Sequence, residues 1–169
     1  FNSGIDHMVI TVSAPGDIEI TEQLKIDNAT YTLTIKGNTL YRGADNISLF
    51  EVNEGASLVL ENITLDGQKG IYPNNGNSLV YVNGGTFTMN SGAALKNNAS
   101  SNYLGGGGVL IDKVTFDMKD GEISGNKAEK GCGVYIDGFA DGESVFFKMS
   151  GNAVLSNNIA TTNGGGVYV

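Results

Sequence analysis

The 169-residue sequence predicts an all-β fold: a single-stranded, right-handed parallel β-helix with three short strands in each coil of about 25–33 residues. Apolar residues recur at a spacing near 30, each short run alternates with period 2, and no stretch has helical periodicity. Because a repeat of this length leaves no room for a crossover helix, the chain must coil so that corresponding strands pair in parallel. The right-handed sense follows from the general handedness of parallel crossovers.

The first strand of each coil is marked by a short phrase that ends on a β-branched residue, as in GGGVYV and GCGVYI. Successive end residues are separated by 30, 29, 25 and 33 positions. We therefore expect strands near 48–52, 78–82, 109–111 and 134–136, stacked in parallel. The end residues are Val52, Val82, Ile111, Ile136 and Val169.

Two further series advance in step with the first and mark the ends of the second and third strands. Their steps are 29, 29 and 31 for the second strand and 30, 28 and 32 for the third. Within the second strand, Phe87 and Met89 are expected to face the core and Thr88 to face outward. The second series is Leu60, Met89, Met118 and Met149, and the third is Leu65, Leu95, Ile123 and Leu155.

Glycine and asparagine replace each other at fixed offsets after the strands, where the chain must turn. Both residue types tolerate positive φ, so their exchange predicts left-handed backbone at the corners. The predicted corner residues are Gly67, Asn97, Gly125 and Asn157 after the third strand, and Gly92, Gly121 and Asn152 after the second.

The repeats are expected to form one domain over residues 1–169, with N-terminal coils at 1–47 and regular repeats at 48–169. The chain starts without methionine and stops within a coil, which predicts a fragment of a longer protein. An open coil leaves backbone groups unpaired, which makes self-association through the coil ends a further candidate interaction.

The charge balance excludes several classes of partner. Ten basic and eighteen acidic residues give a net charge of −8, which disfavours nucleic acid and anionic membranes. No apolar run approaches the roughly 20 residues that cross a bilayer, so no membrane insertion is expected. A single cysteine, Cys132, excludes an internal disulfide and a thiolate metal cluster.

The phrases GGGVYV and GCGVYI, preceded by SNN and SGN turns, resemble bacterial adhesin-like surface proteins with β-helix repeats. They are also distantly similar to the repeats of polymorphic outer-membrane proteins, which pair a Gly-Gly-apolar-apolar motif with Phe-x-x-Asn. The run Phe87–Asn90 fits that second motif, whereas the runs that begin at Phe116 and Phe147 depart from it. The resemblance implies an extracellular or cell-surface location in a bacterium and supplies no catalytic residues.

A column of residues on the outer face of the first strands is the candidate ligand-binding surface. Tyrosine rings on an exposed sheet can lie against sugar rings or contact a protein, so a surface glycan or protein of a host or microbe is the expected partner. The alternative is that the rings only stabilise the sheet, or are covered by a turn or an adjoining domain. The candidate binding residues are Tyr81, Tyr135 and Tyr168.

Acidic residues directly follow the first strand in two successive coils, at Asp112 and Asp137, with Asn53 and Asn83 in the earlier coils. Neighbours in such a column lie about 4.8 Å apart, so the two carboxylates could share a proton or a calcium ion. The alternative is a turn column in which Asn and Asp side chains satisfy local backbone groups. Asp112 and Asp137 are therefore weak metal candidates, and no metal or other cofactor is expected.

These sequence features are compatible with two functions from different classes. The first is a non-enzymatic extracellular bacterial module, a stalk or an adhesin-like binding domain. The second is a carbohydrate-active β-helix enzyme, a polysaccharide lyase or glycoside hydrolase, or a degenerate relative of one. A hydrolase needs two facing carboxylates and a lyase needs a basic proton acceptor. The only arginine, Arg42, is expected in an early turn away from the aspartates, which favours the non-enzymatic module.

Overall fold

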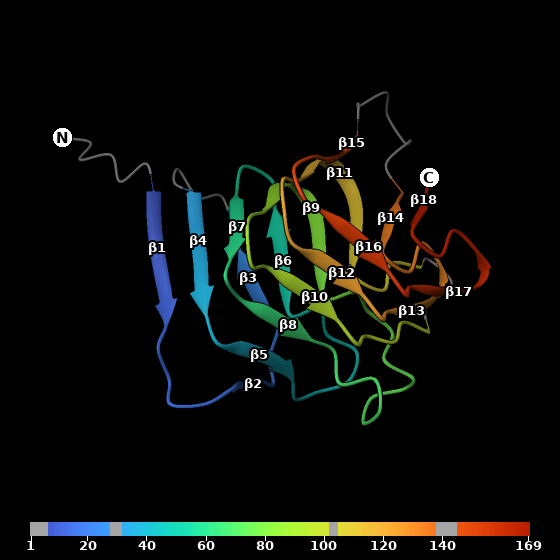
Figure 1. Cartoon of the computed structure of the whole chain (residues 1–169), viewed down its shortest axis with the longest axis horizontal. Coiled ribbons are helices and arrows are strands. Elements are labelled where there is room, and N and C mark those ends of the chain that lie inside the picture. Colours follow the sequence, from blue (N-terminus) through green and yellow to red (C-terminus); the bar gives the residue numbers. More distant parts are fainter. Residues whose placement is uncertain (1–6, 28–31, 102–104, 138–144) are drawn as a thin grey trace.

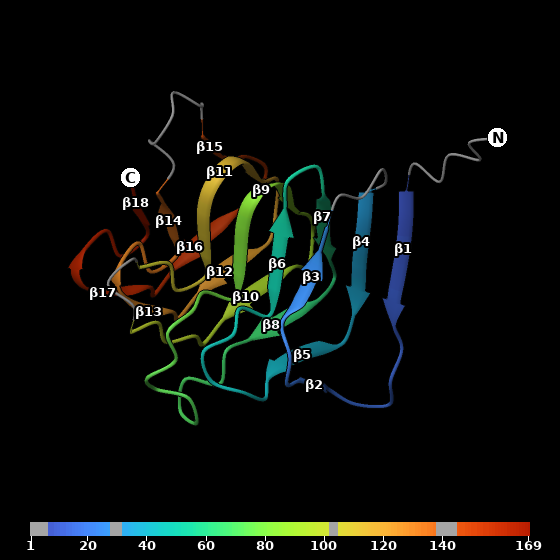
Figure 2. The same ribbon diagram turned by 180° about the vertical axis from the view of Figure 1, so that it is seen from behind.

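The computed structural model describes residues 7–27, 32–101, 105–137 and 145–169. Every regular element in these ranges is a β-strand, and the strands stack in parallel as a β-solenoid of about five turns, with about 29 residues per turn. Figure 1 and Figure 2 show the coils following one another from β1 at one end to β18 at the other. The predicted all-β parallel β-helix is confirmed, and the right-handed sense stays a prediction.

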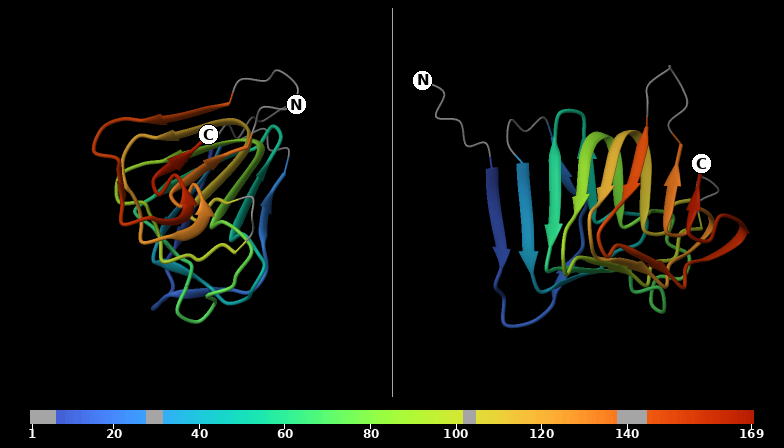
Figure 3. Two further views of the ribbon diagram at one scale, coloured as in Figure 1. Left: turned by 90° about the vertical axis from the view of Figure 1, so that its right-hand side faces the viewer. Right: turned by 45° about the horizontal axis from the view of Figure 1, so that its top comes forward.

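Three sheets form the walls of the solenoid, with ten strands in sheet A, six in sheet B and two in sheet C. Figure 3 shows these walls wrapping around one interior. Sheet A contains β1 (His7–Val12), β3 (Leu24–Ile26), β4 (Thr32–Gly37), β6 (Phe50–Asn53), β7 (Ser57–Glu61), β9 (Val80–Met89), β11 (Val109–Met118), β14 (Val134–Ile136), β15 (Phe146–Met149) and β18 (Val167–Tyr168). Sheet B contains β2 (Ile18–Ile20), β5 (Thr39–Arg42), β8 (Thr64–Asp66), β10 (Ala94–Lys96), β12 (Glu122–Ser124) and β16 (Val154–Ser156), and sheet C contains β13 (Lys127–Lys130) and β17 (Ile159–Asn163).

The predicted first strands pair in parallel, and the predicted third strands form sheet B. Two coils depart from the prediction of three short strands, because β9 and β11 each run through the first and second strand positions as one ten-residue strand. Asn53 pairs with both Asn83 and Gly84, and the β9–β11 register shifts beyond Ile111. Irregular strand pairing therefore replaces a corner between the first and second strand positions of these coils.

The core consists of apolar columns that run parallel to the solenoid axis. The Phe87 and Phe116 rings stack with centroids 4.8 Å apart, and the Phe116 and Phe147 rings follow at 5.0 Å. Met89 and Met118 are fully buried in the adjacent column, whereas Thr88 is half-exposed, so the predicted inward and outward faces are confirmed. Each fully buried apolar side chain of this size contributes about 1.5–3 kcal/mol to folding.

Five of the predicted corner residues have the expected left-handed backbone. Positive φ is tolerated there because glycine and asparagine avoid most of the steric cost that other residues meet. Their φ angles are 56° at Asn97, 63° at Gly125, 52° at Asn157, 71° at Gly92 and 86° at Gly121.

Two corner predictions are wrong by one residue. At the first, Gly67 still donates its N–H to the Lys96 carbonyl, and Gln68 has the positive φ of 49° because its N–H folds back onto the Asp66 carboxylate. At the second, Gly151 has φ 58° in place of Asn152, since glycine stands one position earlier in that turn. Only the second shift follows a glycine, because at the first corner the left-handed residue is Gln68 although Gly67 stands beside it.

A column of asparagines, the asparagine ladder (Asn75, Asn98, Asn126 and Asn158), lines the corner that follows sheet B; the first three are buried and Asn158 is half-buried. The Oδ1 atom of Asn158 accepts the Asn126 backbone N–H at 3.1 Å, and Asn158 Nδ2 donates to the Ile123 carbonyl at 2.8 Å. Asn98 Nδ2 donates to the carbonyls of Asn77 and Gly107, both at 2.8 Å. These side chains thus satisfy backbone groups that the strand ladders leave unpaired at the corner.

Candidate binding surfaces

The tyrosine column lies on the outer side of sheet A, in register across successive coils. Tyr81 pairs with Leu110, Leu110 pairs with Tyr135, and Tyr135 pairs with Tyr168. Tyr81 and Tyr168 are half-exposed. The Tyr168 ring stacks on the Tyr135 ring at 5.3 Å, with an angle of 10° between their planes, and Lys130 Nζ lies 5.4 Å from the Tyr168 centroid. The Tyr135 and Tyr168 rings therefore stack on each other, and Tyr168 also lies near a lysine of the preceding coil.

Tyr135 is not available as the exposed platform that the sequence suggests, because only 8% of the residue is accessible. The backbone of the adjacent turns closes over it: a Cβ atom on Gly105 would lie 2.9 Å from Tyr135 Cδ2, and one on Gly131 would lie 2.7 Å from Tyr135 Cβ. Contrary to the prediction from sequence, Tyr135 does not offer an open ring face to a ligand. Neighbouring turns cover this residue, as in the alternative interpretation of the column. The column is thus interrupted as a sugar-stacking surface.

The two candidate aspartates are hydrogen-bonded to the same column. The Tyr81 hydroxyl donates to Asp112 Oδ2 at 3.3 Å, and the Tyr135 hydroxyl donates to Asp137 Oδ1 at 3.4 Å. In the earlier coils, Asn83 Nδ2 donates to Asn53 Oδ1 at 3.1 Å. No group of three or more His, Cys, Asp or Glu side chains that could hold a metal ion occurs in the described ranges.

The environment of Tyr81 changes its acidity. Burial is the largest cause and raises the pKa of Tyr81 to about 12, and the nearby Asp112 carboxylate acts in the same direction. Both effects disfavour the phenolate, since it would be poorly solvated and would lie next to another negative charge. Tyr81 is therefore a neutral hydrogen-bond donor at physiological pH.

Arg42 is fully buried on β5, not in a turn as the sequence suggests. Its guanidinium donates to the carbonyls of Ala44 and Ile47 and to Asn98 Oδ1, so it joins the asparagine ladder. Burial lowers the pKa of Arg42 to about 10, which leaves the side chain cationic at neutral pH. A buried arginine of this kind supports the corner and is inaccessible to a substrate.

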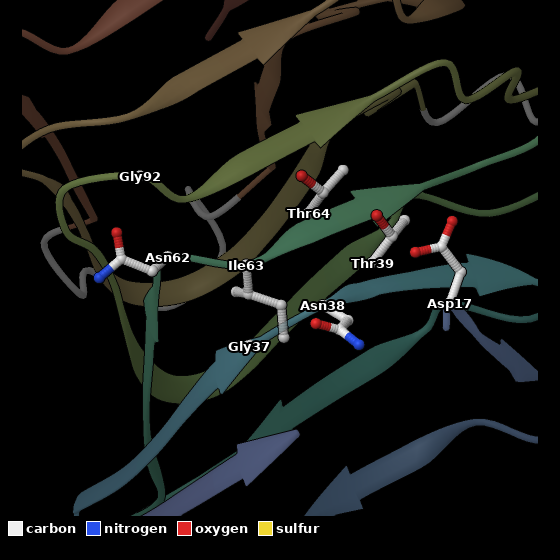
Figure 4. Close-up of a pocket in the computed structure, with 8 residues that line it drawn as sticks. All are labelled: Asp17, Gly37, Asn38, Thr39, Asn62, Ile63, Thr64 and Gly92. Atoms are coloured by element: carbon white, nitrogen blue, oxygen red, sulfur yellow. The ribbon is translucent and has the colours of Figure 1, made fainter. Parts of the chain in front are cut away.

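Sequence reasoning did not single out a polar trough at the corner between sheets A and B. Two hollows, of about 420 Å³ and 430 Å³, meet at Gly92 and together extend along the solenoid axis. Figure 4 shows the first hollow, in which Thr64, Thr39 and Asp17 follow one another across neighbouring coils. We name this feature the corner trough. Its lining residues are Asp17, Gly37, Asn38, Thr39, Asn62, Ile63, Thr64, Gly92, Ala93, Ala94, Asp120, Gly121, Glu122, Asn152 and Val154.

The floor of the corner trough is built from the first residue of successive sheet B strands. Thr39 pairs with Thr64, Thr64 with Ala94, Ala94 with Glu122, and Glu122 with Val154. Neighbouring floor residues are therefore spaced by about 4.8 Å, the distance between paired strands. This register gives the trough a regular repeat along its length.

The wall of the corner trough consists of turns, and glycine is required at two of them. A Cβ atom on Gly92 would lie 2.3 Å from Asn62 Oδ1, and one on Gly121 would lie 2.4 Å from the Ala93 carbonyl oxygen. Both residues also have positive φ. The turns can therefore pack closely on one another while the floor stays accessible.

Half of the polar side chains of the trough already bind neighbouring groups. Asp120 accepts the Gly121 N–H at 2.6 Å, and Glu122 Oε1 accepts the Ser156 hydroxyl at 2.7 Å. In contrast, the hydroxyls of Thr39 and Thr64 have no hydrogen-bond partner within the described ranges. The trough lining contains carboxylates, amides and hydroxyls and no lysine or arginine, which suits a ligand that is rich in hydroxyl groups and uncharged.

Comparison of the chain with protein-family models, with curated proteins and with solved structures finds no match. The described part of the chain contains no helix long and apolar enough to span a bilayer.

Proposed function

We propose that this chain is a non-enzymatic extracellular bacterial surface module, a rigid stalk that binds a neutral glycan chain along its corner trough. The observation that carries the proposal is the trough itself, which is open and extended along the axis, with a mainly polar first hollow and a second hollow of mixed lining. A small-molecule site is normally an enclosed and mostly apolar cavity, whereas a linear polymer needs a long accessible groove.

The spacing of the trough suits a sugar polymer. Two strand spacings amount to about 9.6 Å, close to the length of a disaccharide, so each sugar ring would span one coil. The hydroxyls of Thr39 and Thr64 lie on adjacent coils and are open to such a ligand. Each direct hydrogen bond of this kind contributes about 0.5–1.5 kcal/mol.

The charge of the trough favours neutral over acidic glycans. Asp17 lines one hollow, and Asp120 and Glu122 line the other. The protein as a whole has a net charge of −8, so a polyuronic acid would be repelled along its whole length. A bacterial surface location rests on the resemblance of the GGGVYV and GCGVYI phrases to adhesin-like repeats.

The continuous hydrophobic core supports the proposed role as a rigid stalk. Apolar columns run through every coil from β1 to β15, so bending the solenoid would open packed contacts at each level. A solenoid built in this way holds its lateral surfaces at fixed positions along the axis.

Binding of defined hexasaccharides by isothermal titration calorimetry tests the proposal. The neutral probes are cello-, xylo- and mannohexaose, and the acidic probe is hexagalacturonate. We expect at least one neutral probe to bind and the acidic probe not to bind. A double variant, Thr39→Val with Thr64→Val, should weaken binding about tenfold, because it removes two hydroxyls and keeps strand-forming side chains.

A matched control replaces two outward threonines of β9, Thr86→Val with Thr88→Val, and should bind as the wild type does. Equal loss in both double variants, or binding of hexagalacturonate alone, would contradict the trough as the glycan site. The same mixtures are assayed for new reducing ends and for unsaturated products. Either product would identify a carbohydrate-active enzyme and refute the non-enzymatic part of the proposal.

A further inference from the structure

A lateral cavity of about 250 Å³ lies between the loop that joins β8 to β9 and the coils that follow it. Its lining consists of Pro73 and Asn74 from the loop, residues 99–101 and 127–129 from the next two coils, and Thr161 on β17. We name this feature the side cavity. It shares no residue with the corner trough or the tyrosine column. Sites for drug-sized ligands usually measure about 300–1,000 Å³, so the side cavity suits a smaller molecule.

The loop wall of the side cavity is held in place by hydrogen bonds to the next coil. The Ser101 N–H donates to the Asn75 carbonyl at 2.7 Å, and the Ser101 hydroxyl donates to the Asn74 carbonyl at 2.9 Å. Asn75 Nδ2 also donates to the Ala99 carbonyl at 3.0 Å. Because the wall is already ordered, a ligand does not have to order it on binding, which reduces the entropic cost of association.

Strand β13 places two oppositely charged side chains beside the side cavity. Ala128 is only 2% exposed, so the alternation of the strand turns its neighbours Lys127 and Glu129 outward. Ala99 in the preceding coil pairs with Lys127, which brings residues 99–101 alongside the two charges. Two residues along a strand are about 6.6 Å apart, and this distance separates the Cα atoms of Lys127 and Glu129.

Neither of these charges has a partner in the part of the chain that the structure describes. The Lys127 ammonium and the Glu129 carboxylate form no ion pair or hydrogen bond with each other or with another described residue. Both charges are therefore available to a ligand. They are the only charged side chains in the lining, which thus has no net charge, although the whole protein has a net charge of −8. A ligand with a single charge would be attracted by one group and repelled by the other, whereas a zwitterion can satisfy both.

We propose that the side cavity binds a dipeptide with free ends, whose carboxylate contacts Lys127 and whose ammonium group contacts Glu129. An extended chain of two residues spans at most about 7 Å, which matches the separation of the two Cα atoms. The Asn74 carboxamide and the Thr161 hydroxyl line the same cavity and have no partner within the described ranges, so they can bind the peptide group. The site is separate from the corner trough, and the inference does not depend on glycan binding.

Titration of the ¹⁵N-labelled protein with dipeptides tests the proposal. The probes are L-alanyl-L-alanine and diglycine, each compared with its N-acetylated form, which lacks the ammonium group, and with its C-terminal amide, which lacks the carboxylate. We expect saturable amide shifts in residues 99–101 and 127–129 with both dipeptides. The blocked forms should have dissociation constants at least tenfold larger, because each loses a charge-assisted contact. Residues 37–39 and 62–64 of the corner trough should not shift, so this outcome is separate from that of the hexasaccharides.

Two variants assign the contacts at the two ends of the ligand. Lys127→Gln should weaken binding of the free dipeptides about tenfold and leave binding of the amides unchanged, because an amide has already lost the group that Lys127 contacts. Glu129→Gln should show the same pattern with the acetylated probes. Lys113→Gln and Glu54→Gln are the matched controls, since both residues are exposed, lie outside the side cavity and should leave binding unchanged. Absence of saturable shifts with both dipeptides, equal affinity for free and blocked probes, or equal weakening of both blocked forms by either variant would overturn the proposal.

Discussion

The backbone N–H of Asn98 donates to the Oδ1 atom of Asn126, one coil further along the axis, at 3.0 Å. Asn126 repeats the relationship with Asn158, and its own Nδ2 atom also donates to the Leu95 carbonyl at 3.3 Å. Asn98 and Asn126 are fully buried. Each asparagine side chain therefore completes the hydrogen bonding of a neighbouring coil at a corner where strand pairing stops.

Replacing Asn126 by alanine should be strongly destabilising. The change leaves the Asn98 N–H and the Leu95 carbonyl without these partners, and each buried group left unsatisfied costs about 1–3 kcal/mol. We expect a total loss above roughly 2 kcal/mol in the free energy of unfolding, measured by urea denaturation. Asn152→Ala is the control, because Asn152 is exposed and makes only a 3.5 Å contact with Asp120. Similar losses in both variants would show that the ladder does not support the corner.

Gly121→Ala should destabilise the protein by about 1–3 kcal/mol through backbone strain. Gly121 has φ 86°, and an added Cβ atom would lie 2.4 Å from the Ala93 carbonyl oxygen. Gly70→Ala provides the comparison, because a Cβ atom there meets nothing within 4 Å and φ is not left-handed. That change should be neutral or slightly stabilising. Equal urea midpoints for the two variants would contradict the corner geometry.

The raised pKa of Tyr81 predicts a loss of stability at alkaline pH. Below pH 10, the ordinary pKa of tyrosine, the hydroxyl is protonated in both the folded and unfolded states, and its contribution to stability is complete. Between about pH 10 and the folded-state pKa of about 12, the unfolded state loses this proton first, so stability falls as pH rises.

Tyr81→Phe should remove this component of the pH dependence, which is measured by urea denaturation at pH 9, 10 and 11. Asp112→Asn keeps a hydrogen-bond acceptor for the Tyr81 hydroxyl but removes the charge that helps to raise its pKa. We expect this second variant to lie between the wild type and Tyr81→Phe. Parallel pH profiles for all three proteins would show that Tyr81 does not titrate as the structure implies.

The fold could be predicted from sequence because its determinants are local and repeated. Met89 and Thr88 lie on the predicted inner and outer faces, since the period-2 alternation of a strand decides this within a few residues. The corner prediction failed at Gly67 and Asn152 because the left-handed residue is selected within each turn, beside the Asp66 carboxylate at the first corner and at Gly151 at the second.

The candidate site was less predictable, because it depends on contacts between coils. Tyr135 has the alternation of an outward residue, yet the turns at Gly105 and Gly131 close over it. Arg42 has the charge of a surface residue and is buried against carbonyl groups and Asn98. The threonines of the corner trough lie about one repeat apart in sequence, at positions 39 and 64, and only the strand register reveals that they adjoin.

The binding of a neutral glycan along the corner trough is tested most directly by mapping the contact with ¹⁵N-labelled protein. Amide chemical shifts are recorded while cello-, xylo- or mannohexaose is added up to millimolar concentration. We expect the shifted resonances to lie in residues 37–39, 62–64, 92–94 and 120–122, with Tyr81 and Tyr168 unaffected. Shifts confined to the tyrosine column, or no shift with any of the three sugars, would contradict the trough as the binding site.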